Sequence, residues 1–219
     1  DRNEISSVLG ALREIDNRWD IDVLRGHTEL DANQMAAPNR TAAVKSGLAG
    51  LRAAEPRADS ATMKLGLGEL AMALLEKADL VEKYKLESSG AKIALHAILS
   101  TASELGAQPV DTRKGDAKQR ELQQLAAQLG YAAQQYYWLG RNARPASLEL
   151  AAGQVRELAV ALSEAARTQA AGLEGAIQEL LKHKRAEEDL FAKVSSLSSG
   201  PRLDNLTFAF NRELETTLQ

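Results

Sequence analysis

The 219-residue sequence has no cysteine, little aromatic content and few prolines. The absence of cysteine excludes disulfide frameworks, thiol nucleophiles and thiolate metal sites. It is compatible with an oxidising compartment such as a periplasm, but cytosolic helical proteins also often lack cysteine. Aromatic residues make up 4% of the chain and only five prolines interrupt it. Period-two runs of β-branched and aromatic residues are hard to find, whereas alanine and leucine, the best helix formers, are abundant. These features predict an all-α fold.

The charges of the sequence are nearly balanced, with 27 Lys and Arg against 30 Asp and Glu. No strong basic face is implied, so we expect no nucleic-acid partner. No apolar stretch approaches the roughly 20 residues that a membrane span requires, and no signal peptide is recognisable. The sequence begins at Asp1 without a methionine and ends at Gln219 inside a helical pattern. This favours a piece of a longer chain whose flanking segments could include membrane spans.

Motifs for catalysis or metal binding are missing from the sequence. His27, His96 and His183 are scattered, and there is no HExxH pair for zinc. The glycines of Lys64–Gly68 lack the spacing of a Walker or dinucleotide-binding loop, and no GxSxG elbow occurs. The many carboxylates fall on helix faces that we expect to be solvated. We therefore expect no catalytic activity, no metal and no cofactor in this chain.

Residues 60–105 carry one unbroken helical pattern with a polar centre. At about 1.5 Å rise per residue this helix would be roughly 70 Å long, which exceeds the reach of one ordinary four-helix bundle. Apolar ends and a polar centre predict two stacked antiparallel four-helix bundles that share the helix. Its core positions form two rows with heptad spacing, one of Leu67, Leu74, Val81, Ser88, Leu95 and Ala102 and the other of Leu70, Lys77, Tyr84, Ala91, Ile98 and Leu105.

The remaining helices are predicted from apolar periodicity and from the breaks between periodic segments. If the termini lie at one end, residues 1–82 and 200–219 form a near bundle and residues 83–199 a far bundle. This arrangement requires the chain to reverse between 147 and 198, near 168–172 or near 183–187, and no proline favours either place. The expected helices span about 3–33, 40–53, 60–105, 116–141, the segments between 147 and 198, and 203–219.

The polar centre of the long helix, Tyr84 to Lys92, is a first candidate site. Small and polar residues at core-facing positions leave space and hydrogen-bond donors where leucine would fill the core. A ligand there could pair a carboxylate or phosphate with Lys85, with Tyr84 as an apolar wall and Ser88 as a hydroxyl. A coupling point between the bundles is a related possibility. The alternative, which the usual exposure of polar helix positions favours, is a solvated junction where neither core needs large side chains.

Two further groups of residues are candidate binding sites. Arg25 and His27 are polar residues near the end of the first helix that could meet a ligand at a bundle interface, although such residue types are usually exposed. An aromatic cluster on the fourth helix could form a pocket with a cationic anchor for an anion. Because consecutive residues point to different faces of a helix, we favour capping of the bundle core. The cluster consists of Tyr131, Tyr136, Tyr137, Trp138 and Arg141.

Three short passages resemble one known family. Asp22-Val23-Leu24-Arg25 is followed by Asn33, and Leu80–Lys85, followed by Lys92 and Leu95, resembles an acidic-x-Phe-Lys segment with its trailing basic and leucine positions. Asn211–Leu214 resembles a terminal Tyr-Arg-x-x-Leu pattern. Together the passages resemble the DAHL family of all-helical ligand-sensing domains, which are found outside the membrane in bacterial sensor kinases.

The resemblance implies a periplasmic input domain of an inner-membrane protein. Such a domain would bind a small molecule or a periplasmic binding protein and would signal by helix displacement. The parent chain would be a transmembrane sensor histidine kinase, or a chemoreceptor, and a homodimer at full length. Residues 1–82 and 200–219 would then be the membrane-proximal bundle and residues 83–199 the membrane-distal one. Without the resemblance, a structural or adaptor bundle that binds protein partners through its exposed faces is the alternative function.

Overall fold

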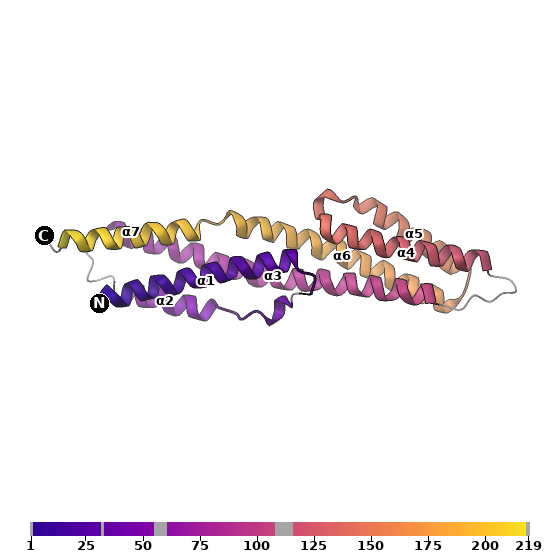
Figure 1. Ribbon diagram of the computed structural model, residues 1–219, viewed down its shortest axis with the longest axis horizontal. Coiled ribbons are helices and arrows are strands. Elements are labelled where there is room, and N and C mark those ends of the chain that lie inside the picture. The colour runs from indigo at the N-terminus through magenta and orange to yellow at the C-terminus, as the bar shows by residue number, and fades with distance from the viewer. Residues whose placement is uncertain (1, 32, 55–60, 108–115, 218–219) are drawn as a thin grey trace. The chain divides into compact units, whose positions relative to one another are not determined.

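A computed structural model describes residues 2–31, 33–54, 61–107 and 116–217 of the chain (Figure 1). These described residues contain helices and no strand, so the predicted all-α fold is confirmed. Two short 3₁₀ helices, η1 (Gln34–Ala36) and η3 (Gly140–Asn142), interrupt the α-helical pattern. The α-helices are α1 (Arg2–Thr28), α2 (Thr41–Ala54), α3 (Ala61–Ala107), α4 (Asp116–Leu139), α5 (Pro145–Val160), α6 (Glu164–Ser196) and α7 (Ser199–Thr217).

The chain divides into two helical units, and the two longest helices, α3 and α6, contribute residues to both. Unit 1 contains residues 1–86 and 190–219, and unit 2 contains residues 87–189. The predicted boundaries are 82/83 and 199/200, so residues 83–86 and 190–199 fall in a different unit than predicted. The reason is packing, because Tyr84 and Val194 are both buried in the core of unit 1.

Unit 1 is a four-helix bundle of α1, α2, the first part of α3, and α7 together with the end of α6. Its core contains Trp19 of α1, Val44 of α2, Leu74 of α3 and Leu203 of α7, all almost completely buried. Figure 1 shows that α1 and α7 run in opposite directions, so α1 starts at the same end of the unit where α7 finishes. An ion pair between Arg13 of α1 and Asp204 of α7 joins these two helices.

The two predicted core rows of α3 are buried at all twelve positions. Heptad spacing keeps the same face of a helix toward its neighbours, so a helix that uses both rows must be covered along most of its length. Two polar members of the rows, Lys77 and Ser88, are buried together with the leucines. The polar centre of α3 is therefore buried at Lys85 and Ser88, and the solvated junction considered above is wrong for these two residues.

Unit 2 is a second four-helix bundle, formed by the last part of α3 with α4, α5 and the first part of α6 (Figure 1). Alanines fill many of its core positions and allow the helices to approach closely. Four of them, Ala126, Ala133, Ala159 and Ala166, are at most 1% exposed. The bundle therefore depends less on large side chains than the core of unit 1, which contains a tryptophan.

The chain reverses at residues 161–163, between α5 and α6, which corrects both of the predicted positions. Helix α6 is continuous through 168–172 and through 183–187. Its start is capped by Ser163, whose Oγ accepts a hydrogen bond of 3.1 Å from the backbone N–H of Ala166. The break contains neither proline nor glycine, so a single serine cap was the only signal in the sequence.

Other helix boundaries differ from the predictions by a few residues. Helix α1 ends at Thr28 rather than near 33, and η1 follows it. Helix α7 begins at Ser199, with Pro201 in its first turn, where the missing N–H of proline costs no intrahelical hydrogen bond. The breaks that separate the expected helix 60–105 from its neighbours on either side, at 55–60 and around Pro109, lie outside the described residues.

Candidate functional site

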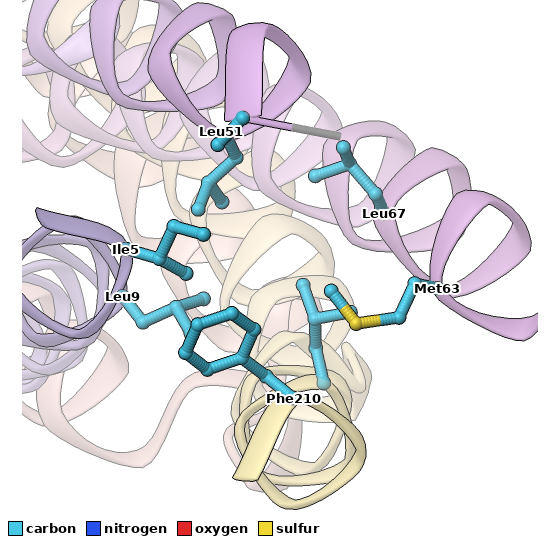
Figure 2. A pocket seen from close by; sticks show the side chains of 8 residues that line it. Ile5, Leu9, Leu51, Met63, Leu67 and Phe210 are labelled. Atoms are coloured by element: carbon cyan, nitrogen blue, oxygen red, sulfur yellow. The ribbon is translucent and has the colours of Figure 1, made fainter. Parts of the chain in front are cut away.

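The core of unit 1 contains a small apolar cavity near the start of α1 and the end of α7 (Figure 2). Its volume of about 20 Å³ is close to that of a single water-sized probe, and its walls carry no polar side chain. The cavity is therefore a gap in packing rather than a site for a small molecule. It is lined by Ile5, Leu9, Leu51, Ala54, Met63, Leu67, Leu206 and Phe210.

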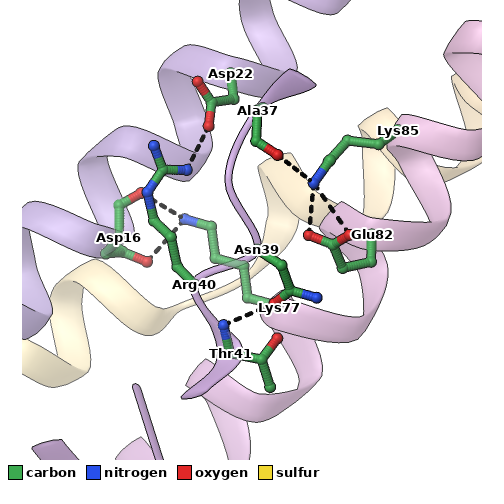
Figure 3. Close-up of polar contacts among 9 residues, drawn as sticks. All are labelled: Asp16, Asp22, Ala37, Asn39, Arg40, Thr41, Lys77, Glu82 and Lys85. Carbon is green, nitrogen blue, oxygen red and sulfur yellow. Dashed lines mark hydrogen bonds and ion pairs between the residues drawn. The ribbon is translucent and has the colours of Figure 1, made fainter. Parts of the chain in front are cut away.

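A buried ion cluster joins three helices of unit 1 around Lys77. The Lys77 ammonium lies 2.8 Å from Oδ1 of Asp16 and donates to the backbone oxygen of Asp16 at 3.5 Å (Figure 3). It also lies 2.6 Å from Oδ1 of Asp20. The Ser199 hydroxyl donates to the same Asp16 oxygen at 2.6 Å. We call these four residues the Lys77 cluster. It links α1, α3 and the first turn of α7.

The Lys77 cluster is unevenly buried. The side chains of Lys77 and Asp16 are 3% and 5% exposed, whereas that of Asp20 is 55% exposed. A buried ammonium is stable only when carboxylates and other acceptors replace its lost water. Lys77 has three N–H donors, and the three acceptors named above account for them. The cluster thus satisfies its buried cation and reaches solvent on the Asp20 side.

A groove of about 400 Å³ lies beside the Lys77 cluster. It combines an apolar wall from α1 and α6 with the charged side chains of Asp16, Asp20 and Lys77, and it includes the junction between α6 and α7. Small-molecule sites commonly have this composition of apolar walls with a few converging polar groups. The groove is lined by Asp16, Asn17, Asp20, Val23, Leu24, Lys77, Phe191, Val194, Ser195, Leu197, Ser199, Gly200 and Pro201.

The groove was not predicted, although part of its signal was present in the sequence. Lys77 interrupts an apolar heptad row, and Asp16 falls between Leu12 and Trp19 on the apolar stripe of α1. A charged residue at a core position of each of two helices is a signal for a buried pair. The two residues are 61 positions apart, so only the fold brings them together.

Lys85, a predicted site residue, holds the segment after η1 against α3. Its ammonium donates to the backbone oxygen of Ala37 at 2.9 Å and to the two Glu82 carboxylate oxygens at 2.8 and 3.0 Å (Figure 3). In the same region Arg40 pairs with Asp22 at 2.5 Å. The donors of Lys85 are therefore occupied by the protein, and pairing with a ligand anion would require one of these bonds to break.

Tyr84 and Ser88, the other two residues of this candidate, are both fully buried. Tyr84 packs in unit 1 against Gly26, where a Cβ atom would lie 2.9 Å from the tyrosine ring. Ser88 belongs to unit 2. Ligand binding by this group stays a prediction, and the positions of the three residues do not place them in the groove beside the Lys77 cluster.

Of the two candidates near the end of α1, His27 lies next to the groove and Arg25 does not. The His27 ring stacks on the Phe191 ring with a centroid distance of 4.2 Å and an interplanar angle of 16°. Because Phe191 lines the groove, this stacking fixes the orientation of one of its walls. Arg25 is exposed and bonds Glu29, one turn later on the same helix, at 3.3 Å.

The aromatic cluster of α4 does not converge on one pocket. Tyr136 and Tyr137 are buried, whereas Trp138 and Tyr131 are exposed. The Tyr137 and Trp138 rings meet edge to face with a centroid distance of 5.2 Å. Ligand binding by this cluster stays a prediction. The side chain of Arg141 lies outside the described residues.

Unit 2 contains its own buried lysine, in α6. Lys184 is 2% exposed and its ammonium lies 3.0 Å from Oε2 of Glu187, which is fully buried. The same ammonium lies 4.5 Å from the centre of the Tyr137 ring, a cation–π contact. We call these three residues the Lys184 cluster.

Burial raises the pKa of Tyr137, and the nearby Glu187 carboxylate raises it further. Burial also raises the pKa of Tyr136, helped by Glu188 and opposed by Arg185. The Tyr137 hydroxyl has no hydrogen-bond partner among the described residues. Both phenols are therefore neutral at ordinary pH, and neither is suited to acid–base chemistry.

The glycine in the polar centre of α3 has a packing role in unit 2. A Cβ atom on Gly90 would lie 2.7 Å from ring atoms of His183, so the ring occupies the space that a side chain would need. The His183 Nδ1 atom lies 2.6 Å from Oε2 of Glu87, and Nε2 lies 3.0 Å from Oε2 of Glu179. Because Gly90 has no side chain, the His183 ring of α6 can pack against α3 at this position.

The comparisons with known proteins give one match. The family model of the DAHL domain matches residues 1–219, the whole chain. The chain therefore belongs to the DAHL domain family, which is a family of helical sensor domains rather than of enzymes. No curated protein and no solved structure matches the chain.

The described residues lack two kinds of feature. Their His, Asp and Glu side chains form no group of three that could hold a metal ion. None of their helices combines the length and the apolar content needed to cross a bilayer.

Proposed function

We propose that this DAHL domain is the periplasmic input domain of a transmembrane sensor histidine kinase, and that it binds a small molecule in the groove beside the Lys77 cluster. The observation that carries the proposal is the groove itself, because its lining comes from α1, α3, α6 and the first turn of α7. Membership of a sensor-domain family over the whole chain supports it. A periplasmic binding protein is the other class of partner that such a domain could take.

The proposed signal is a displacement of α7 along α1. Asp16 of α1 and Ser199 of α7 share a hydrogen bond at the edge of the groove, so a ligand that contacts Asp16 can change how the first turn of α7 is held. A ligand shifts such an equilibrium only by its difference in affinity for the two arrangements, and coupling of this kind is typically about 1–3 kcal/mol. The start of α1 and the end of α7 lie at one end of unit 1, from which both would lead to the membrane.

The proposed placement makes unit 1 membrane-proximal and unit 2 membrane-distal. In the full-length parent we expect a homodimer, because histidine kinases act as pairs of chains. The sequence of the parent gene tests this context directly. Membrane spans on both sides of the domain, with a kinase module downstream, are expected. An open reading frame that ends near Gln219 without such segments would favour the adaptor function instead.

The helix displacement can be measured with spin labels. The chain has no cysteine, so two can be introduced without removing any. Ser6 on α1 and Asn211 on α7 are both exposed, and ligand binding should change the distance between labels at these positions. A second pair, Ser6 with Ser46 of α2, serves as the control and should not change. Equal changes in both pairs, or no change in either with the groove occupied, would count against the proposed signal.

Exposed apolar side chains on unit 1 favour a second function, binding of a protein partner. Leu65, Met72 and Phe208 are between 66% and 75% exposed. If the domain is an adaptor, substituting Leu65 and Met72 with serine should abolish partner binding. Closing the groove should leave such binding intact.

A further inference from the structure

The Lys77 cluster leaves no donor for an anionic ligand. The three N–H groups of Lys77 are directed to Asp16 and Asp20, and the Ser199 hydroxyl hydrogen is given to Asp16. What remains for a ligand in this part of the groove is the second oxygen of each carboxylate. A groove that presents acceptors favours a ligand that carries donors.

The first turn of α7, which would otherwise attract an anion, already faces a carboxylate. A helix N-terminus presents backbone N–H groups and the positive end of the helix dipole. Asp16 accepts a hydrogen bond from Ser199 there, and a Cβ atom built on Gly200 would lie 3.7 Å from Oδ2 of Asp16. The protein's own carboxylate therefore takes the place that a ligand anion would need.

The charges that line the groove sum to a negative value. Asp16 and Asp20 contribute two negative charges and Lys77 one positive charge, while Asn17 and Ser195 are neutral. Asp20 is half-exposed, so its free oxygen can reach a ligand without prior movement of the buried pair. A cation in the groove would restore neutrality, and a charge-assisted hydrogen bond to Asp20 would hold it.

The rest of the groove suits an apolar body. Val23, Leu24, Phe191 and Val194 line it, and the Phe191 ring is held in place by its stacking on His27. The volume of about 400 Å³ equals that of roughly a dozen waters at ~30 Å³ each, which accommodates an organic molecule of about ten non-hydrogen atoms. Such a molecule would lie with one face on the Phe191 ring.

We infer that the groove binds a small organic ammonium ion. Its ammonium group pairs with Asp20 and with Oδ2 of Asp16, and its apolar body packs against Phe191 and Val194. The inference rests on the proposed function, because a sensor domain needs a small-molecule site, and it names the chemical class of that small molecule.

The test compares molecules that share one body and differ in charge. Binding to the 219-residue chain is measured by calorimetry and by thermal shift with 2-phenylethylamine, 2-phenylethanol and phenylacetate, and with isopentylamine as a smaller amine. We expect the amines to bind and phenylacetate not to bind. The neutral alcohol should bind roughly ten- to a hundredfold more weakly than its amine, because it lacks the charge-assisted bond. If neither amine binds, or if phenylacetate binds as tightly as 2-phenylethylamine, the inference is wrong.

Matched variants locate the bound amine. Asp20→Asn removes the exposed carboxylate and should weaken 2-phenylethylamine roughly ten- to a hundredfold. Asp79→Asn makes the same change at an exposed residue that pairs with Lys83 outside the groove, and it should leave binding unchanged. If Asp20→Asn binds the amine as the unaltered chain does, the assignment is wrong.

A second pair of variants blocks the groove without touching its charges. Ser195 is exposed and lines the groove, so Ser195→Phe should abolish amine binding. Ala192→Phe adds the same ring to an exposed position of α6 outside the groove lining and should have no effect. Amine binding that survives Ser195→Phe would contradict the proposed location.

The spin-label measurement separates this inference from the proposed function. If amines bind and the distance between the labels on Ser6 and Asn211 stays constant, the signalling proposal fails and the ligand class stands. If the distance changes only with an anionic compound, the ligand class fails and the signalling proposal stands.

Discussion

The two units each bury a lysine, and the surroundings of the two lysines differ. Lys77 in unit 1 contacts two carboxylates and a backbone oxygen, beside a groove. Among the described residues, Lys184 in unit 2 contacts the carboxylate of Glu187 and the face of the Tyr137 ring. The first cluster has acceptor oxygens to spare and reaches solvent through Asp20, whereas the Lys184–Glu187 pair is enclosed.

This difference separates a cluster that can accept a further partner from one that cannot. A ligand cation can pair with the spare carboxylate oxygens of the Lys77 cluster and leave all three contacts of Lys77 in place. In the Lys184 cluster, loss of the single carboxylate leaves a buried cation without a counter-charge, which is strongly unfavourable. This difference supports the proposal that unit 1 recognises the ligand, and it favours a structural role for the buried pair of unit 2.

The largest expected effect is that of Glu187→Ala, which leaves Lys184 buried without its carboxylate. We expect unit 2 to lose about 3–5 kcal/mol of unfolding free energy. Urea denaturation can be followed by the fluorescence of Trp138, which lies in unit 2, in a background that carries Trp19→Phe. The control is Glu174→Ala, since Glu174 forms an exposed pair with Arg156 and should cost less than about 1 kcal/mol. A loss below 1 kcal/mol for Glu187→Ala would contradict the enclosed pair.

Asp16→Ala should have a smaller effect on unit 1, about 2–3 kcal/mol, because Lys77 keeps its contact with Asp20. The measurement uses the fluorescence of the buried Trp19 in a background that carries Trp138→Phe. Asp20→Ala is the matched change at the exposed carboxylate and should cost about 1 kcal/mol or less. If Asp16→Ala destabilises unit 1 more than Glu187→Ala destabilises unit 2, the contrast between the clusters is lost.

Alkaline pH should destabilise unit 2 through Tyr137. Its pKa is raised in the folded state, so above pH 10 the unfolded chain releases a proton that the folded chain retains, and stability falls as pH rises. The loss of unfolding free energy is up to about 1.4 kcal/mol per pH unit for one such group, and it is absent below pH 9.

The Tyr137→Phe variant should lack the part of the pH dependence that Tyr137 contributes, as measured by urea denaturation between pH 9 and 11. It should be as stable as the unaltered chain at pH 7, because the hydroxyl has no partner among the described residues. Identical alkaline slopes in the two proteins would refute the assignment.

The smallest expected effects should be equal in the two units. Gly10 in α1 and Gly153 in α5 both lie in helices, and a Cβ atom on either would meet nothing within 4 Å. Changing each to alanine should stabilise its own unit by about 0.5–1 kcal/mol through helix propensity alone. Thermal unfolding of the two single variants provides the measurement. If the two glycine variants gain unequal stability, the units respond differently even to surface changes. The stability differences assigned to the two lysine clusters would then need to be corrected for this.

Sequence periodicity predicted the long helix well because packing repeats along a helix. Both heptad rows of α3 are buried throughout, including their polar members. The division into two helical bundles followed from the length of that helix. The reversal between α5 and α6 was missed, because Ser163 is a single capping residue in a segment without proline or glycine.

The candidate site was harder to predict because its parts come from distant segments. Lys77 was noted as a polar interruption, but periodicity cannot show that Asp16 faces it from α1 or that Ser199 completes the cluster. His27 was a candidate because of its residue type. Its ring stacks on Phe191, which lines the groove, so His27 lies behind that wall. Lys85 was one of the candidates for pairing with a ligand anion, and its donors are taken by Glu82 and Ala37.

Because heptad repeats are regular, a helix could pack against its neighbours in a shifted register. The Lys77 cluster makes such a shift of α3 unfavourable. A shift of α3 by seven residues would bring Leu70 or Tyr84 to the place of Lys77, and most apolar contacts would survive the exchange. Asp16 would then face an apolar side chain, and a buried carboxylate without a counter-charge is among the costliest defects in a protein interior. A polar group at one core position is known to set the register of coiled coils in this way. A bundle in the shifted register is therefore destabilised by its unpaired charges, whereas its apolar packing would be largely preserved.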